Sequence, residues 1–215
     1  MQASDRVESG PLPPTTAQVT GLVLAGGRGL RWGGRDKGLI DYGGRPLVAW
    51  VLDALAPQVG QLLISANRNL DLYAAFGQPL VSDQIEGFQG PLAGVAAALA
   101  LAKTPWLVTA PCDGPALPPD LVARLALALA EQCGSAATVQ VEGRIEPVYA
   151  LIPVSRAQDL AAYLSAGGRS VRGWLERQPL ALADFSDRAQ AFANLNSPES
   201  CQLTVGSWQL LPPDH

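Results

Sequence analysis

The chain has 215 residues, 48% of them hydrophobic, and a formal net charge of −4. This length is enough to bury one sizeable core but short for two full domains, so we expect one compact domain. The negative charge argues against broad attraction to nucleic acid or anionic lipid, because the field of the whole chain repels phosphate. We therefore expect no nucleic-acid partner, and any phosphate site must be local.

The cysteines and the single histidine narrow the possible chemistry. Cys112, Cys133 and Cys201 are widely spaced and form no metal-ligand pattern, which favours a reduced, cytoplasmic setting. The only histidine is His215, so Ser-His-Asp, Cys-His and multi-histidine zinc schemes lack a usable imidazole. Residues 1–18 show no export signal, and no later segment has about 18 uninterrupted apolar residues, so no membrane span is expected.

The hydrophobic pattern predicts strands and helices that alternate along most of the chain. Strands are predicted at 19–25, 61–66, 79–82, 106–110, 136–141 and 147–152. Helices are predicted at 46–55, 71–76, 91–102 and 121–131, with Pro46 and Pro91 at first helical positions. A loop is expected between the first strand and about Gly44. The last third is less regular, with helices near 156–165 and 171–176 and a strand near 182–185, and one interpretation is a lid or substrate-side extension.

This alternation predicts an α/β fold: a three-layer, doubly wound, mostly parallel sheet with helices on both faces. Ligands of such folds bind at the carboxyl ends of the strands. The domain is expected to span residues 19–203, between a flexible N-terminal tail (1–18) and a C-terminal tail (204–215). The sequence contains no internal repeat.

A glycine-rich segment follows the first predicted strand directly. Residues 24–37 contain five glycines and four cations. Glycines let backbone amides wrap an anion and cations neutralise its charge, which favours a triphosphate ligand over the alternative of a flexible surface loop. The segment is not a Walker loop, because the pattern G-x-x-x-x-G-K-[ST] does not occur in it. It does not match G-x-G-x-x-G either, because Trp32 takes the place of the third glycine.

Two aspartates follow predicted strands at the edge where a ligand is expected. Asp113 comes after the strand at 106–110 and is a candidate Mg²⁺ ligand, because magnesium needs few protein carboxylates and completes its shell with water and phosphates. Asp83 follows the strand at 79–82 and is expected to face the same crevice. The alternative for each is a cap or turn residue. Residues 90–94 provide either free amides at a helix N-terminus or only a packing helix.

Together these residues resemble the molybdenum cofactor guanylyltransferases, within the wider superfamily of MobA-like nucleotidyltransferases. The likeness runs in order from about residue 19 to 203, through 24–39 (LAGGRGLRWGGRDKGL), 65–68, Asp83, 90–94, 111–113, Arg169 and 194–199. The first motif alone is typical of the whole superfamily, which includes enzymes that use CTP or sugar phosphates. The combination resembles the guanylyl branch, and it implies a Rossmann-like fold of the nucleotide-diphospho-sugar transferase type.

The resemblance implies roles for individual residues. The residues implied to bind the nucleotide are Leu24, Ala25, Gly26, Gly27, Lys37, Ser65, Asn67, Asp83 and Asp113. Among them, Lys37 is implied to hold the phosphates and Asp113 the Mg²⁺, and these two are the implied catalytic residues. A weaker assignment to the pterin side covers Gly90, Gly94, Arg169, Asn194 and Asn196.

The implied reaction transfers GMP from GTP to molybdopterin with Mg²⁺, releases diphosphate and forms molybdopterin guanine dinucleotide in the cytoplasm. Molybdenum-cofactor delivery proteins or molybdoenzymes are the implied protein partners. Relatives usually carry Met at Trp32 and commonly Asn at Ser65. Serine offers one polar atom where an amide offers two, so the base preference is open and Asn67 is a candidate to compensate. The alternatives are a molybdopterin cytidylyltransferase, another nucleotidyltransferase, or a non-catalytic nucleotide-binding protein.

Overall fold

A seven-stranded sheet forms the centre of the molecule in the computed structural model, which describes residues 12–25, 34–83 and 90–193. The strand order is β5-β4-β1-β6-β8-β7-β9. The bounds are β1 Val19–Leu24, β4 Gln61–Ser65, β5 Leu80–Val81, β6 Trp106–Pro111, β7 Ala136–Val141, β8 Arg144–Pro153 and β9 Leu180–Asp184. Of these strands, β8 runs antiparallel to both neighbours, and the other neighbouring pairs are parallel.

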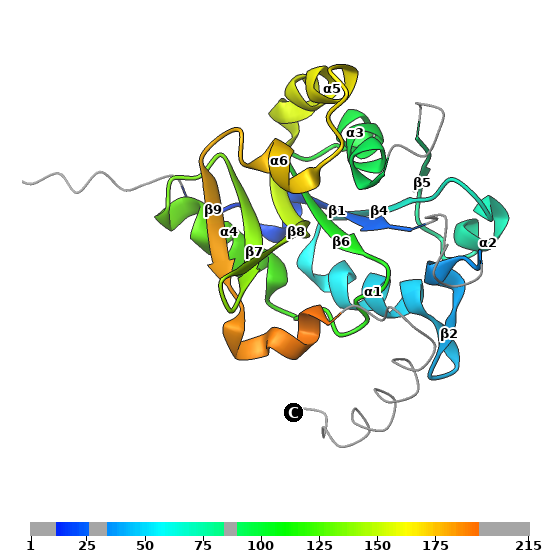
Figure 1. The fold of residues 1–215 in the computed structure, drawn as a ribbon. Coiled ribbons are helices and arrows are strands. Elements are labelled where there is room, and N and C mark those ends of the chain that lie inside the picture. The colour runs from blue at the N-terminus through cyan, green and yellow to red at the C-terminus, as the bar shows by residue number, and fades with distance from the viewer. Residues whose placement is uncertain (1–11, 26–33, 84–89, 194–215) are drawn as a thin grey trace, which may run out of the picture.

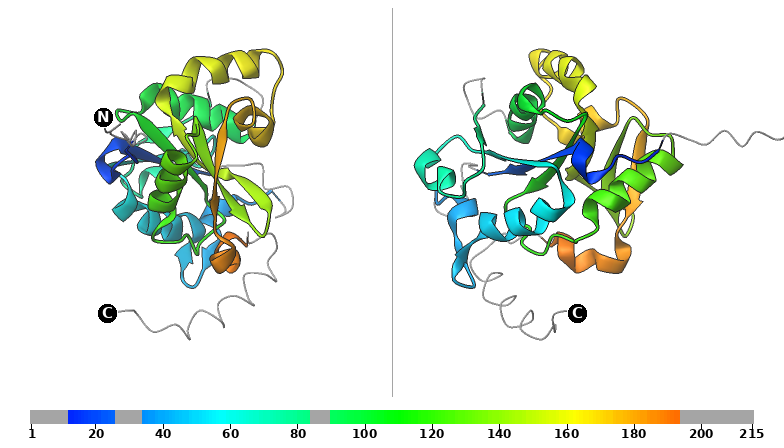
Figure 2. Two further views of the ribbon diagram at one scale, coloured as in Figure 1. Left: turned by 90° about the vertical axis from the view of Figure 1, so that its left-hand side faces the viewer. Right: turned by 180° about the vertical axis from the view of Figure 1, so that it is seen from behind.

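Helices cover both faces of this sheet (Figures 1 and 2). One face carries α1 (Leu47–Leu55) and α4 (Leu121–Glu131), and the other carries α3 (Pro91–Leu101), α5 (Ala157–Ser165) and α6 (Val171–Leu175). The short helix α2 (Leu70–Ala74) precedes the edge strand β5. This arrangement confirms the predicted three-layer, mostly parallel α/β fold.

The central strand β1 explains why its sequence is apolar without alternation. Successive side chains of a strand point to opposite faces, and here both faces are covered by helices. Leu22 packs into the core on the α3 side, whereas Val23 packs into the core on the α1 side. Both side chains are fully buried.

The order of the strands reverses at β1, next to the strand ends where the sequence predicted a ligand. From β1 the chain proceeds outward through β4 to β5 on one side, and then returns to place β6 on the other side of β1. In open α/β sheets, ligands bind where the strand order reverses in this way. The last residue of β1, Leu24, is paired with Ser65 of β4 and with Pro111 of β6, so three strands end side by side.

Two elements differ from the sequence-based expectation. The hairpin of β2 (Asp41–Tyr42) and β3 (Arg45–Pro46) lies where a loop was expected. It closes through Gly43 and Gly44, which have φ values of 62° and 82°. Pro46 ends this hairpin and caps α1, which begins at Leu47.

The last third of the described chain belongs to the main domain and does not form a separate lid. Strand β9 pairs in parallel with β7 and extends the sheet, and α5 and α6 pack with α3 on one face. The 3₁₀ segment η6 (Ser186–Phe192) follows β9 and places Phe192 in the core on the α4 side. Within the described residues, no helix has the length and apolar character needed to cross a membrane.

Candidate functional site

Apart from Arg169, the candidate residues of the described chain gather at the carboxyl ends of β1, β4, β5 and β6. Two backbone hydrogen bonds extend the sheet just beyond the strands: Ala25 N–H donates to the Ser65 carbonyl at 2.8 Å, and Cys112 N–H donates to the Leu24 carbonyl at 3.0 Å. Ala25 thus begins the glycine-rich segment directly beside the segment that carries Asp113. The candidates Gly26, Gly27, Asn194 and Asn196 lie outside the described residues.

Lys37 and Asp113 form an ion pair at this edge, although 76 positions separate them in the sequence. Lys37 opens the 3₁₀ turn η3 (Lys37–Leu39), and Asp113 lies two positions after the end of β6. Their side chains are 21% and 15% exposed, so the two charges interact in a partly desolvated place where electrostatic effects are stronger than in water. A cation and a carboxylate therefore lie side by side at this edge of the sheet.

The carboxylate of Asp36, next to Lys37, has three partners, two just before α2 and one within it. Tyr73 donates to its Oδ1 at 2.7 Å, Asn69 donates to its Oδ2 at 3.0 Å, and Arg68 Nε lies 3.4 Å from Oδ2. Arg68 also donates to the carbonyls of residues 34 and 35, each at 2.8 Å. The end of the glycine-rich segment is therefore fixed to the loop between β4 and α2. Sequence reasoning did not assign a role to Asp36; its only signal was its place in the 24–39 motif.

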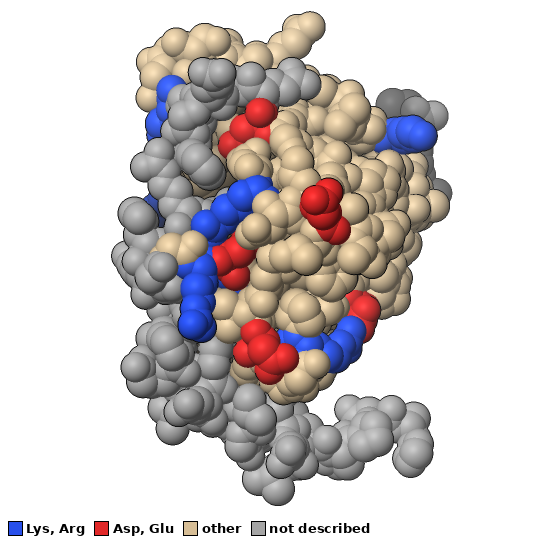
Figure 3. Space-filling model, turned by 90° about the vertical axis from the view of Figure 1, so that its right-hand side faces the viewer, with Lys and Arg blue, Asp and Glu red and all other residues tan. Residues whose placement is uncertain are grey.

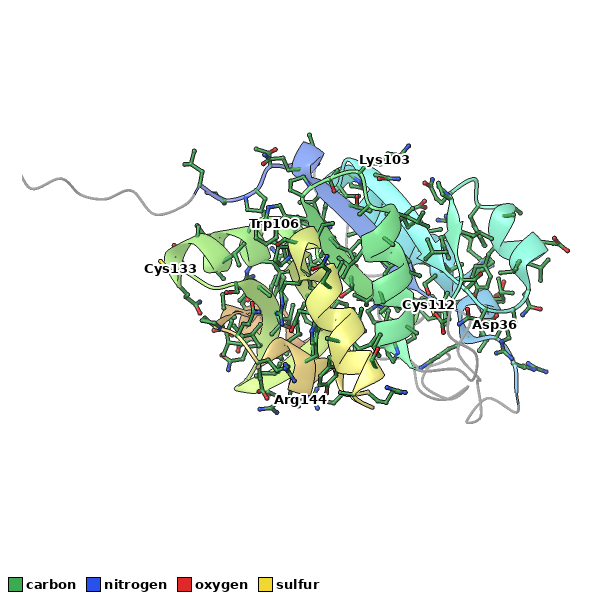
Figure 4. The ribbon with its side chains drawn as sticks, turned by 90° about the horizontal axis from the view of Figure 1, so that it is seen from above. Asp36, Lys103, Trp106, Cys112, Cys133 and Arg144 are labelled. Carbon is green, nitrogen blue, oxygen red and sulfur yellow. The ribbon has the colours of Figure 1, made fainter. Side chains whose placement is uncertain are left out.

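Gly38 allows this segment to lie against the end of β6. A Cβ atom at Gly38 would lie 2.5 Å from the Tyr73 hydroxyl and 3.3 Å from Cys112 Sγ. Figure 4 shows Asp36 and Cys112 close together, at the opposite end of β6 from Trp106. Burial raises the pKa of the Cys112 thiol, and the negative charges of Asp113 and Asp36 raise it further. The thiol stays protonated, and Cys112 packs as a small buried residue.

Leu24, Ser65 and Gly94 pack against one another where β1 and β4 end. Ser65 is 4% exposed, and a Cβ atom at Gly94 would lie 2.3 Å from its Oγ and 3.3 Å from Leu24 Cδ2. The absence of a side chain at Gly94 is thus what lets α3 approach the ends of β1 and β4. The sequence assigned Gly94 weakly to the pterin side, whereas the structure groups it with two residues assigned to the nucleotide. Gly90 caps the start of α3 with a φ of 78°.

Asn67 and Asp83 are joined by two hydrogen bonds. Asn67 Nδ2 donates to Asp83 Oδ2 at 2.8 Å, and the Asp83 N–H donates to Asn67 Oδ1 at 2.8 Å. Partial burial raises the pKa of the Asp83 carboxyl, and the hydrogen bond from Asn67 opposes this rise. Both polar atoms of the Asn67 amide are engaged with Asp83, so its structural role is to orient that carboxylate.

Arg169 lies apart from these groups, just after α5. Its Nη1 donates to the carbonyls of Leu164 at 2.8 Å and Gly168 at 2.6 Å, and so satisfies the C-terminal end of that helix. Of the described hydrogen bonds, none joins Arg169 to another candidate residue.

The charges around the site are mixed. Figure 3 shows the face of the molecule that carries α2 and the β2–β3 hairpin, and on its coloured part Lys and Arg side chains alternate with Asp and Glu side chains.

Comparison of the chain with known proteins identifies its family. The model of the MobA-like NTP transferase domain matches residues 21–182. The molybdenum cofactor guanylyltransferase of Cupriavidus taiwanensis is 50% identical over 184 residues, which cover 83% of this chain and 92% of that protein. The protein of the same name from Yersinia pseudotuberculosis is 46% identical over 185 residues, which cover 86% of this chain and 94% of the relative.

Solved structures share the fold at lower identity. The molybdopterin-guanine dinucleotide biosynthesis protein A of Archaeoglobus fulgidus aligns with a TM-score of 0.75 and 23% identity, covering 89% of this chain and 100% of that one. A 2-C-methyl-D-erythritol 4-phosphate cytidylyltransferase from Thermus thermophilus aligns with a TM-score of 0.65 and 19% identity, covering 91% of this chain and 100% of that one. The family resemblance seen in the sequence is confirmed: the chain belongs to the MobA-like NTP transferases and, among them, to the family of the molybdenum cofactor guanylyltransferases.

Proposed function

We propose that this chain transfers GMP from GTP to molybdopterin in a Mg²⁺-dependent reaction that releases diphosphate and forms molybdopterin guanine dinucleotide. The names of relatives that are about half identical over most of the chain support this proposal. The observation that carries it is the contact between Lys37 and Asp113 at the point where the strand order reverses. One cation for phosphate and one carboxylate for a hard metal ion are the groups that nucleotidyl transfer requires.

The chemistry of the site fits Mg²⁺. No cluster of three or more His, Cys, Asp or Glu side chains suited to a metal occurs among the described residues. Asp113 would therefore hold the ion largely with the help of substrate phosphates and water, which is the usual pattern for magnesium. Bound Mg²⁺ would neutralise charge that develops on the phosphates.

The residues of the chain then act by positioning and by neutralising charge. A terminal phosphate oxygen of molybdopterin attacks the α-phosphorus of GTP, a new P–O bond forms, and the bond to the β-phosphate breaks, so that diphosphate leaves. Lys37 holds the phosphates, and Asp83, oriented by Asn67, faces the base. No covalent intermediate with the enzyme is required. We place the reaction in the cytoplasm, with cofactor delivery proteins or molybdoenzymes as recipients of the product.

Transfer of CMP from CTP is the second candidate function, and the observation that favours it is Ser65. The sequence leaves the base preference open at this position, and Asn67 does not compensate in the simple way the sequence suggested, because its amide is bonded to Asp83. The base preference would therefore depend mainly on Asp83.

The test is diphosphate release from GTP and from CTP with Mg²⁺, each with and without molybdopterin. We expect release that depends on GTP and molybdopterin. Asp113→Ala should abolish turnover, and Lys37→Ala should lose about 2–4 kcal/mol of transition-state stabilisation, as for one preorganised electrostatic donor. The matched controls are Asp71→Ala on the exposed surface of α2 and Lys103→Ala just after α3. Selective use of CTP would establish the second candidate, and full activity of Asp113→Ala would refute both.

A further inference from the structure

The hydroxyl of Tyr149 is buried in the core without a hydrogen-bond partner among the described residues. Tyr149 lies on β8 and is 1% exposed. Burying an unpaired hydroxyl costs stability, whereas phenylalanine would fill the same space without that cost. An unpaired polar group in an otherwise apolar position therefore calls for an explanation beyond packing.

This hydroxyl lies directly against the segment that carries Asp113. A Cβ atom at Gly114 would lie only 2.2 Å from the Tyr149 hydroxyl oxygen and 3.5 Å from the ring carbon that bears it. Gly114 does not have a positive φ, so backbone conformation does not explain the glycine. The space that a side chain at Gly114 would need is occupied by the Tyr149 hydroxyl.

Aromatic packing keeps the Tyr149 ring in this position. The ring of Phe192, from η6, meets the Tyr149 ring edge to face at 5.0 Å and an angle of 87°. Phe185 packs on Phe192 with ring centres 5.1 Å apart. A ring enclosed in this way cannot swing toward solvent, so its hydroxyl stays aimed at the Asp113–Gly114 segment.

The electrostatic surroundings keep the hydroxyl able to donate. Burial raises the pKa of Tyr149, and the negative charges of Asp113 and Glu146 raise it further. The group therefore remains protonated under ordinary conditions. The same negative charges attract the positive end of the O–H dipole.

We propose that Tyr149 is a positioning residue for Asp113: its hydroxyl donates a hydrogen bond to Asp113 when Lys37 turns from that carboxylate to the substrate phosphates. This inference rests on the proposed function, which gives Lys37 to the phosphates and Asp113 to the metal. In the structure, Lys37 pairs with Asp113. Once Lys37 has left, Tyr149 keeps the carboxylate in place from the core side.

The first experiment compares wild type with Tyr149→Phe. We expect an unchanged or higher melting temperature, because an unpaired buried hydroxyl is removed, together with a fall in kcat of about tenfold and little change in KM for molybdopterin. Binding of Mn²⁺ to the enzyme with GTP but without molybdopterin should weaken by about tenfold, which reports on Asp113 without turnover. Tyr163→Phe, which removes a hydroxyl from α5 and keeps the ring, is the matched control.

A double-mutant cycle separates positioning from packing. Gly114→Ala should lower both the melting temperature and activity, because the new methyl group meets the Tyr149 hydroxyl. Combining it with Tyr149→Phe should restore the melting temperature, since the steric conflict is gone, but not kcat. Wild-type kcat and Mn²⁺ affinity in Tyr149→Phe would overturn the proposal, as would a loss of activity matched by a loss of stability. If wild type transferred no GMP, the proposed function would fail while the Mn²⁺ comparison still tested Tyr149.

Discussion

The Asn67–Asp83 pair holds a carboxylate in a partly desolvated position at the end of β5. Desolvation raises the pKa of Asp83, and the hydrogen bond from Asn67 moves it in the opposite direction. Asn67 therefore has two effects on Asp83: it fixes the orientation of the carboxylate, and it helps to keep it ionised. A carboxyl group accepts hydrogen bonds with both oxygens, as the donor edge of a guanine base requires, only when it is ionised.

Asn67→Ala should move the acid limb of kcat/KM for GTP to higher pH. Removing the hydrogen bond that lowers the pKa of Asp83 raises that pKa further, so the ionised form is lost earlier as pH falls. The measurement is the pH profile of kcat/KM with GTP in wild type and Asn67→Ala, with Asn69→Ala as the neighbouring amide control. Superimposable acid limbs in wild type and Asn67→Ala would show that Asp83 does not bind the base in its ionised form.

The raised pKa of Asp83 makes stability depend on pH with the opposite sign from that of a salt-bridged aspartate. Because the folded pKa of Asp83 is raised, the folded state holds a proton more readily than the unfolded chain. The contribution of Asp83 to stability therefore falls as pH rises through the interval between its ordinary and its raised pKa. Replacement by Asn should not lower stability at neutral pH, and a loss of GTP use in that variant would be a loss of recognition.

Single residues show where sequence reasoning succeeds and where it stops. Asp113 was predicted from the carboxylate that magnesium requires, the resemblance to the family singled out Lys37, and the two residues lie together in the structure. Asp36 was not predicted, because its partners come from residues 68–73 and no local pattern shows that its carboxylate is buried. The position of Gly94 against Ser65 likewise depends on how closely α3 approaches β4, which local sequence does not specify.

At the scale of elements, η6 is held against α4 by one side chain of that helix. Arg124 pairs with Asp187 at 2.9 Å and also donates to the Asp184 carbonyl. Its guanidinium lies 4.0 Å from the centre of the Phe185 ring. Because Phe185 and Phe192 continue this contact to Tyr149, the position of η6 bears on the packing beneath the Asp113 segment.

Arg124→Ala should lower the free energy of unfolding by about 1 kcal/mol, mainly through loss of the guanidinium contact with Phe185. The pair with Asp187 lowers the pKa of that carboxyl, so its contribution is present at neutral pH and is lost as pH falls through the lowered value. Denaturation at neutral and at acidic pH measures the difference in the free energy of unfolding between wild type and Arg124→Ala. This difference should be smaller at acidic pH than at neutral pH. Arg172→Ala, which breaks an exposed pair between α6 and its C-cap residue Glu176, is the control and should have little effect. A difference that does not change with pH would show that the pair between Arg124 and Asp187 does not contribute to stability.

The elements themselves were largely predictable, and the exceptions have a common cause. The ranges of α4 and β7 agree with the hydrophobic pattern residue for residue. The antiparallel direction of β8 was not predicted, because it depends on the tight turn at Glu142 and Gly143, where φ is 48° and 80°, and on pairing with β6, more than 30 positions away. The periodicity of a strand shows its buried side chains but not its direction.

For the whole molecule, topology brings four distant segments to one edge of the sheet. Residues at the ends of β1, β4, β5 and β6 meet there because the chain reverses its order at β1. The resulting site combines Lys37 with carboxylates on a chain whose net charge is −4. Phosphate binding must therefore come from local contacts, and in the free protein Lys37 and Asp113 neutralise one another.

GTP with Mg²⁺ should stabilise the entire fold, because a ligand that joins four segments at one edge binds the folded state and not the unfolded chain. At a concentration 100 times the dissociation constant, the linkage amounts to about 2.7 kcal/mol. For a domain of this size, that corresponds to a rise in melting temperature of roughly 5–10 °C. Thermal denaturation with GTP and with CTP, each with Mg²⁺ or with EDTA, measures the effect, and Asp113→Ala should lose the part that depends on Mg²⁺. An equal rise with both nucleotides would mean that Asp83 and Ser65 do not select the base, and no rise with either would contradict the assignment of this edge as the nucleotide site.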